Sequence, residues 1–448
     1  MRKTSNAKAT QRDRCAEWTP SEIDFVEAIA ANPDVYALAE HLPAQKLNNG
    51  GRPPTHPAAV YVIHIALAGV LGSHRKAAHA MANRHHWSMI RDFARTTAQL
   101  ELAAAPPTRN MCEYNRKLIA PHVESLAAAF RTTALAQALE HGFLDATTPR
   151  SSTEPSRANF AAADGKVAKC PVSQKIADKW SEQGRQINAD LHTQGGNPEP
   201  VFGAKFWWAT TRAGNRRNSR VILDVRHVTK DDGGEAAVAT MALQSLAQRT
   251  PGLHGVCYDG AFRGKHIDPL LKRGLTVLSP THSGIKATPL TVVHCRCDDD
   301  HELWTRRGEI CERIVLDTGE TTFTPCPVAT RYRRPNTDGS YRWYIEFAAP
   351  CGTVLRERID TKEPDGKRRY NRAEHLRQYV KEGTDGVYKR CYGWREDAES
   401  LNDLLQHTLH KGRMIAYSAA RQYLVMLGFA IGRNSLARLL QNRSTDPA

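Results

Sequence analysis

The stretch that most directly indicates the fold is Tyr392-Gly-Trp-Arg395-Glu-Asp-Ala-Glu399. Tyr392, Arg395 and Glu399 are spaced by three and four residues, so on a helix their side chains share one face. That face would present a phenol, a guanidinium and a carboxylate, a combination suited to holding a metal ion beside a phosphate. The stretch therefore predicts a helix that carries part of a functional site.

Two aspartates far upstream lie in short contexts typical of strand ends. They occur in Ala162-Ala-Asp164-Gly-Lys166 and in Val256-Cys-Tyr-Asp259-Gly-Ala-Phe-Arg263-Gly264. Taken alone, an Asp-Gly pair is a common turn signal, and Glu399 would suit a solvated helix. The joint pattern of two strand-end aspartates and a later Tyr/Arg/Glu helix favours a shared site that only the fold can assemble.

Together these motifs resemble those of the DDE transposases of bacterial insertion sequences. The third motif of that family runs Tyr, two residues, Arg, three residues, Glu, six residues, Lys. Tyr392, Arg395 and Glu399 match it in identity and spacing, whereas the final position is Gln406, a departure. The resemblance covers roughly residues 159–437.

The resemblance implies that Asp164, Asp259 and Glu399 are the catalytic residues and ligands of two Mg²⁺ ions, for which Mn²⁺ can substitute. A metal pair can activate the attacking oxygen, stabilise the leaving oxygen and absorb charge at phosphorus. Magnesium prefers oxygen ligands, so three carboxylates and substrate oxygens suffice. Glu396 and Asp397 remain rivals of Glu399 for the third ligand.

The implied reaction is metal-dependent cleavage of DNA at the ends of an insertion sequence, followed by strand transfer into target DNA. The implied partner is double-stranded DNA, bound by a homodimer or a larger assembly. Two alternatives remain open. One is a non-mobile nuclease on the same ribonuclease-H-like fold, and the other is an inactive, domesticated copy that acts as a DNA-binding protein.

Several side chains are candidates for contacts to DNA phosphates, because guanidinium, ammonium and phenol groups all donate hydrogen bonds to phosphate oxygens. The resemblance assigns two of them to the predicted helix, and two others follow the aspartates. Gln406 lacks the charge expected of Lys, so that contact would be weakened or taken over by Lys411 or Arg413. The four candidates are Tyr392, Arg395, Lys166 and Arg263.

The resemblance implies, and the order of elements agrees with, an α/β ribonuclease-H-like core that a β-rich insertion interrupts and an all-α N-terminal domain precedes. Beyond residue 156 the patterns read strand, strand, strand, helix, strand, helix, strand, and the aspartates fall on the first and fourth strands. Alternating residues then predict a β-rich block before the acidic helix. The expected domains are 1–150, 156–285, 286–385 and 386–442.

Within residues 1–150, two helices are expected at 58–71 and 73–83, separated by Gly72. The second carries Arg75 and Lys76, which makes them candidates for DNA binding. Two short helices about a glycine, the second basic, are typical of a helix-turn-helix. An ordinary helical hairpin with a solvated basic face explains the same pattern.

The net charge of +15 favours polyanionic partners, since each neutralised phosphate releases counterions. No apolar run approaches the ~20 residues of a membrane span, and the basic N-terminus lacks an apolar signal core. A cytoplasmic, nucleoid-associated protein without a membrane partner is therefore expected.

Ten cysteines are dispersed along the chain and are expected to be reduced. A zinc site is one interpretation of the cluster that begins with a Cys-x-Cys pair. Buried thiols in a β-rich segment are the other. The candidate zinc ligands are Cys295, Cys297, Cys311 and Cys326.

Overall fold

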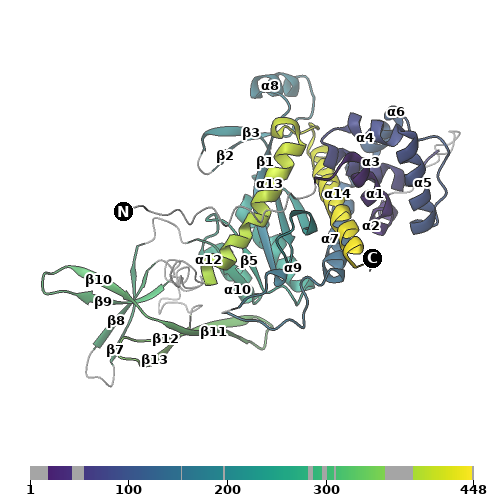
Figure 1. Ribbon diagram of the computed structural model, residues 1–448. Coiled ribbons are helices and arrows are strands. Elements are labelled where there is room, and N and C mark those ends of the chain that lie inside the picture. Colours follow the sequence, from purple (N-terminus) through teal and green to yellow (C-terminus); the bar gives the residue numbers. More distant parts are fainter. Residues whose placement is uncertain are drawn as a thin grey trace, which may run out of the picture. The chain divides into compact units, whose positions relative to one another are not determined.

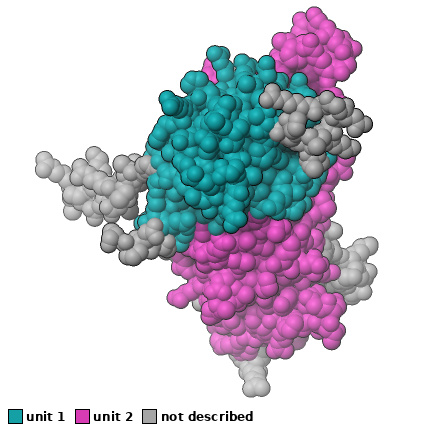
Figure 2. Space-filling view, turned by 90° about the vertical axis from the view of Figure 1, so that its right-hand side faces the viewer, with its two compact units in different colours: residues 1–130, 214–221, 424–448 teal, residues 131–213, 222–423 magenta. Residues whose placement is uncertain are grey.

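The chain forms two compact units in the computed structural model (Figure 2). Unit 1 comprises residues 1–130, 214–221 and 424–448, and unit 2 comprises residues 131–213 and 222–423. Unit 1 thus joins N-terminal helices to a C-terminal segment that the sequence groups with the core. The structure describes residues 19–42, 55–152, 154–194, 197–280, 286–294, 300–306, 309–358 and 387–445.

Unit 1 is helical in its described parts (Figure 1). Its first helix begins with a capping box, in which the Ser21 side chain accepts from Asp24 N and the Asp24 carboxylate accepts from Ser21 N. The helices are α1 (Glu22–Ala31), α2 (Pro33–Glu40), α3 (Ala58–Leu71), α4 (His74–Ala82), α5 (Arg84–Ala98), α6 (Arg109–Ile119), the start of α7 (Val123–Glu140) and most of α14 (Ala419–Thr445).

Helix α14 joins unit 1 because it crosses α3 at glycines. A Cβ atom added to Gly69 would lie 2.1 Å from the backbone N of Phe429, and one added to Gly428 would lie 2.2 Å from the carbonyl O of Ile65. Only residues without a Cβ allow two backbones to approach this closely. The buried, apolar α3 therefore packs directly on the C-terminal helix.

Unit 2 is built on a six-stranded sheet with the order β2-β3-β1-β5-β6, in which β4 also pairs with β3 (Figure 1). Strand β1 runs antiparallel to β3 and parallel to β5, and β5 runs parallel to β6. The strands are β1 (Phe160–Lys169), β2 (Asp190–Gln194), β3 (Asn197–Thr211), β4 (Val221–Val228), β5 (Gly255–Cys257) and β6 (Thr276–Leu278).

Helices cover this sheet and complete its core. Helix α13 lies against β1 and β3, and α9 lies against β3 and α10. Trp394 packs edge-on against Phe160 with ring centroids 5.2 Å apart, which fixes the segment that leads into α13. The helices are α8 (Gln174–Glu182), α9 (Glu235–Arg249), α10 (Gly264–Lys272), α12 (Val387–Tyr392) and α13 (Glu396–Thr408).

Between β6 and α12 the chain forms two further antiparallel sheets, where the sequence predicts a β-rich insertion. The four-stranded sheet has the order β10-β9-β8-β7, and the three-stranded sheet has the order β11-β12-β13. Trp343 of β12 donates from Nε1 to Leu271 O of α10 at 2.8 Å, which ties the second sheet to the core. The strands are β7 (Thr288–His294), β8 (Asp300–Arg306), β9 (Glu309–Val315), β10 (Thr321–Pro325), β11 (Val328–Pro335), β12 (Tyr341–Ala348) and β13 (Val354–Arg358).

The zinc interpretation depends on residues that the structure describes only in part. Cys295 and Cys297 lie outside the described residues. Cys311 and Cys326 are buried free thiols, and burial raises the pKa of each to about 11. Among the described helices, none combines the length and apolar character needed to cross a membrane.

Candidate metal centre

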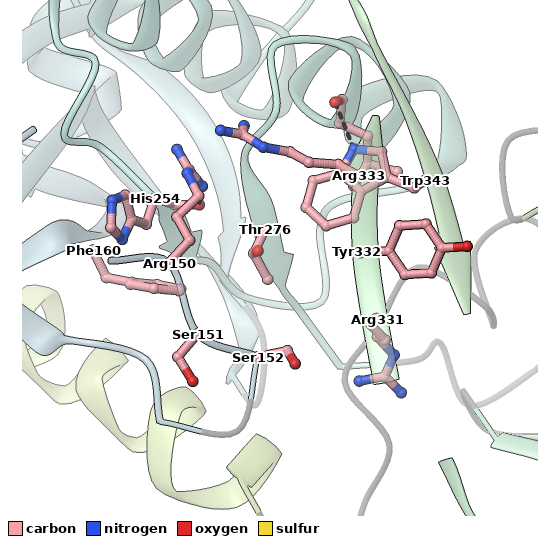
Figure 3. A pocket seen from close by; sticks show the side chains of 11 residues that line it. Arg150, Ser151, Ser152, Phe160, His254, Thr276, Arg331, Tyr332, Arg333 and Trp343 are labelled. Carbon is pink, nitrogen blue, oxygen red and sulfur yellow. Dashed lines mark hydrogen bonds between the residues drawn. The ribbon is translucent and has the colours of Figure 1, made fainter. Parts of the chain in front are cut away.

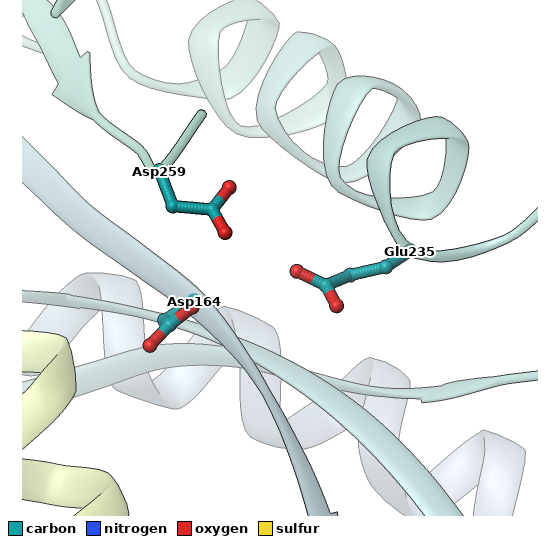
Figure 4. Close-up of side chains that lie close together, drawn as sticks. All are labelled: Asp164, Glu235 and Asp259. Atoms are coloured by element: carbon teal, nitrogen blue, oxygen red, sulfur yellow. The ribbon is translucent and has the colours of Figure 1, made fainter. Parts of the chain in front are cut away.

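The register of two parallel strands brings Asp164 and Asp259 together. Ala162 of β1 is paired with Cys257 of β5, and each aspartate lies two residues beyond its member of that pair. Since side chains alternate along a strand, both aspartates are placed on the same side as the pair. Their carboxylates and that of Glu235 each place an oxygen within 4.8 Å of the others (Figure 4).

Glu235, which sequence reasoning does not select, reaches this group from the first turn of α9. Its side chain passes over β1 at Gly165, where an added Cβ would lie 2.3 Å from Glu235 Cδ. Any other residue at position 165 would displace Glu235 or the strand. The Asp164-Gly165 pair, which taken alone is a turn signal, therefore lies within a continuous strand. The missing Cβ of Gly165 leaves room there for a third carboxylate.

Two donors hold Glu235 in place. Lys205 Nζ of β3 lies 2.5 Å from Glu235 Oε2, and the Tyr258 hydroxyl donates to Glu235 Oε1 at 2.7 Å. Lys205 supplies one positive charge against three carboxylates. The group beside the parallel strands β1 and β5 therefore has more carboxyl groups than Lys205 can neutralise.

Burial and mutual repulsion act strongly on the aspartates. Burial, followed by the charges of Glu235 and Asp259, raises the pKa of Asp164 to about 7. Burial is also the main cause that raises the pKa of Asp259, with Glu235 adding to it. A divalent cation bound between these oxygens would remove the repulsion and favour the ionised carboxylates.

Glu399 lies on α13 and forms an ion pair with Arg395. The charge of Arg395 also lowers the pKa values of Asp164 and Asp259, so this guanidinium is near all three predicted ligands. The Glu399 side chain is 48% exposed, and its oxygens are not part of the group described above. The structure therefore brings two of the three predicted ligands, Asp164 and Asp259, together. Glu399 lies outside this group and is paired with Arg395.

The rivals of Glu399 have different surroundings. Asp397 is buried and pairs with Arg157 at 2.7 Å and with Arg212, which anchors α13 to the core. Glu396 is exposed. Of the acidic residues in the first turn of α13, Glu399 is the one that shares Arg395 with the aspartates.

Polar side chains of α13 continue the contact with β1. Asn402 donates from Nδ2 to Asp164 Oδ2 at 2.8 Å, and Lys166 donates from Nζ to Gln406 Oε1 at 3.0 Å. Gln406 stands where the family motif has Lys. The structure places the ammonium of Lys166 of β1 beside that position.

The other predicted contact residues lie in three settings. The Tyr392 ring stacks on Tyr388 at 5.6 Å, and the Arg395 guanidinium lies 5.6 Å from the Tyr392 ring centroid. Arg263 donates from Nη1 to Gly260 O at 2.6 Å and so folds back onto its own loop. Arg75 and Lys76 are exposed in the first turn of α4, in unit 1.

Comparisons with known proteins supply no relative from which a function could be transferred. The chain matches no protein-family model, and no curated protein or solved structure is significantly similar to it. Conclusions about its chemistry therefore depend on the carboxylate group, the neighbouring cations and the motifs quoted above.

Proposed function

We propose that the protein is a DDE transposase, which cuts DNA at the ends of an insertion sequence and joins them to target DNA with the help of divalent metal ions. The observation that carries the proposal is the convergence of Asp164 and Asp259, each two residues beyond the last paired residue of the adjacent parallel strands β1 and β5. Both belong to short motifs named from the sequence alone. Their convergence with a third carboxylate gives the oxygen-rich donor set that magnesium prefers.

The sheet topology supports a ribonuclease-H-like core. Leaving out β2, the neighbouring strands follow the order β4-β3-β1-β5-β6, with antiparallel pairing of β1 and β3 and parallel pairing of β1, β5 and β6. The resemblance predicts a core with aspartates on its first and fourth strands. Here Asp164 lies on β1, and Asp259 lies two residues after β5. The two antiparallel sheets between β6 and α12 occupy the place of the predicted insertion.

The donor set fits hard divalent ions, which would activate the attacking oxygen and stabilise the leaving oxygen of the phosphodiester. In this proposal Asp164 and Asp259 hold the ions. Arg395 grips the phosphate beside the scissile bond, and Lys166 supports it from β1. If Arg395 bound the phosphate, Glu399 would lose its ion-pair partner and could hold the ions together with the two aspartates.

Glu235 is the geometric competitor of Glu399 for the third position. It lies closer to both aspartates, but Lys205 and Tyr258 engage both of its oxygens. Among the described residues, the ion-pair partner of Glu399 is Arg395, which has an alternative partner in DNA. We therefore assign ligation to Glu399 and a positioning role to Glu235, which raises the proton affinity of Asp164 until metal binds.

The test is cleavage and joining of duplex DNA that carries the element's ends, with Mg²⁺ or Mn²⁺. Asp164→Asn, Asp259→Asn and Glu399→Gln should each reduce cleavage at least about a thousandfold, because each loses a charge that holds metal or stabilises the transition state. Asp317→Asn changes an exposed aspartate between β9 and β10 and is the matched control. Glu235→Gln should retain measurable cleavage.

Each contrary outcome identifies a different alternative. Cleavage without joining would favour a non-mobile nuclease. Binding of DNA without cleavage by the wild type would favour a binding-only protein. Cleavage by Asp259→Asn at the wild-type rate would remove Asp259 from the active site, and loss of cleavage in Glu235→Gln alone would exchange the roles of the two glutamates.

A further inference from the structure

The three-stranded sheet β11-β12-β13 has one face on the core and one face turned away from it. On β12, Trp343 is buried against α10, whereas its neighbours Arg342 and Tyr344 are exposed and half-buried. On β11, the Tyr332 ring and the Arg333 side chain extend from the strand in opposite directions (Figure 3). Since side chains alternate along a strand, every second residue of these strands belongs to an outward face.

The outward face is basic and aromatic. The strand register sets Arg334 of β11 opposite Arg342 of β12, and Tyr332 opposite Tyr344. In the same way Arg358 of β13 lies opposite Tyr344. The face therefore has more guanidinium groups than carboxylates. Its charged and aromatic residues are Tyr332, Arg334, Arg342, Tyr344, Glu346, Arg356 and Arg358.

The two tyrosines support the guanidinium groups from below. The rings of Tyr332 and Tyr344 stack with their centroids 5.3 Å apart. The guanidinium carbon of Arg334 lies 5.4 Å from the Tyr332 centroid and 5.7 Å from the Tyr344 centroid. That of Arg356 lies 5.8 Å from the Tyr344 centroid. A guanidinium uses its flat side for such a contact, so its N–H groups can still donate to an anion.

The charges of this face are only partly compensated within the sheet. Glu346 accepts from the Tyr332 hydroxyl at 3.1 Å. The Tyr332 hydroxyl, with a smaller contribution from Glu346, raises the pKa of Arg356, so Arg356 has partners within the sheet. Arg334 and Arg342 are exposed, and neither is ion-paired with another described residue. These two guanidinium groups are therefore available to an external anion.

We propose that this outward face binds the sugar–phosphate backbone of duplex DNA, with Arg334 and Arg342 each contacting a phosphate. Guanidinium forks match phosphate oxygens in geometry and charge, and such contacts position a duplex without reading its sequence. Because Arg334 and Arg342 are opposite each other on neighbouring strands, their long side chains can reach successive phosphates. No residue of this face belongs to the carboxylate group of the metal centre. The choice of duplex DNA rests on the proposed function.

The experiment measures binding of a fluorescein-labelled duplex to the full chain by anisotropy, over a series of KCl concentrations in buffer with EDTA. The double variant Arg334→Gln/Arg342→Gln should weaken binding about tenfold at about 150 mM KCl. It should also reduce the salt slope of the logarithmic affinity by about 2, because each lost phosphate contact releases about one counterion fewer. Both side chains are exposed, so thermal unfolding should match that of the wild type.

The matched control is Arg306→Gln/Arg313→Gln, which removes the same charge from the four-stranded sheet. Arg306 and Arg313 also lie over aromatic rings, each 5.3 Å from the ring centroid. Each has an acidic neighbour, since Glu309 is opposite Arg306 in the register and Glu302 pairs with Arg313 at 2.9 Å. This control should keep the wild-type affinity and salt slope.

Three results would overturn the inference. They are unchanged binding by the Arg334/Arg342 double variant, equal losses in both double variants, and no binding of the duplex by the wild type. Polyglutamate at equal charge concentration should displace the duplex poorly, and displacement that the double variant abolishes would instead assign the face to an acidic protein. A wild type that binds DNA through this face without cleaving it would contradict the proposed function alone. Normal cleavage and binding by the double variant would contradict this inference alone.

Discussion

Replacing Asp164 by asparagine should stabilise the metal-free protein, although it should abolish the activity. Burial and two neighbouring carboxylates raise the pKa of this group from 3.8 to about 7. The folded protein therefore holds a proton between about pH 4 and pH 7 that the unfolded chain releases, and stability falls as pH rises through this window. Above pH 7 the charged carboxylate carries the whole penalty.

The size of the effect follows from the shift. About three units at about 1.4 kcal/mol each give a ceiling of about 4 kcal/mol above pH 7, and relaxation of the site reduces it to about 2–4 kcal/mol. Asparagine carries no charge, and its single side-chain oxygen can keep one of the two hydrogen bonds that Asp164 accepts on separate oxygens, from Asn402 on Oδ2 and from Gly165 on Oδ1. In a unit of this size, a gain of that order raises Tm by several degrees.

The assay is chemical and thermal unfolding of both proteins in chelator-treated buffer at about pH 8, repeated below pH 4. The difference should shrink towards zero in the acidic sample, because the Asp164 carboxyl is then neutral in both states of the wild type. Added Mn²⁺ should stabilise the wild type and leave Asp164→Asn nearly unchanged. An unaltered or lower stability of the variant at the higher pH would refute the electrostatic reasoning, and Asp317→Asn provides the baseline.

Three other predictions follow from the same geometry. The affinity for Mn²⁺ should rise about tenfold per pH unit below about pH 7 and level off above it, because binding releases the Asp164 proton. A calorimetric affinity that does not change with pH would contradict this. Gly165→Ala should destabilise the protein by about 1–3 kcal/mol because the new Cβ displaces Glu235. Gly214→Ala, which has open space around the new Cβ, should not. Equal unfolding curves of the two variants would disprove the close approach of Glu235 to Gly165. Asp397→Asn should lower stability by about 3–5 kcal/mol, since the buried Arg212 and the partly buried Arg157 then lose the charge of their shared carboxylate. Denaturant unfolding within about 1 kcal/mol of the wild type would contradict this.

The convergence of Asp164 and Asp259 could be predicted from the sequence, because the residues that indicate each strand lie next to its aspartate. Each aspartate follows a short apolar run, and the first and fourth expected strands coincide with β1 and β5. Parallel pairing with Ala162 opposite Cys257 then places the aspartates side by side. A strand's position can be read from its own residues, and the resemblance implied that the two aspartates share a site.

The place of Glu235 in this group could not be predicted from the sequence in the same way. The sequence predicts a helix after the third strand, but the Glu235 side chain reaches the aspartates only because Gly165, far away in the chain, has no Cβ. The Asp-Gly pair reads equally well as a turn. A contact that depends on a missing Cβ atom in another helix or strand leaves no periodic pattern in the sequence.

The C-terminal helix illustrates a similar limit. The sequence assigns residues 386–442 to the core, whereas the structure groups residues 424–448 with unit 1. The reason is the close crossing of α3 and α14 at Gly69 and Gly428. Periodicity identifies a helix and its apolar face but does not identify its partner.

The most direct test of the metal centre is a crystal structure of the protein grown with Mn²⁺ and DNA, in which anomalous scattering locates the metal. The account predicts an ion within about 2 Å of carboxylate oxygens from both Asp164 and Asp259, with Glu399 turned away from Arg395 to the same site. Ordered carboxylates without an anomalous peak between them, or a peak bound elsewhere, would contradict it.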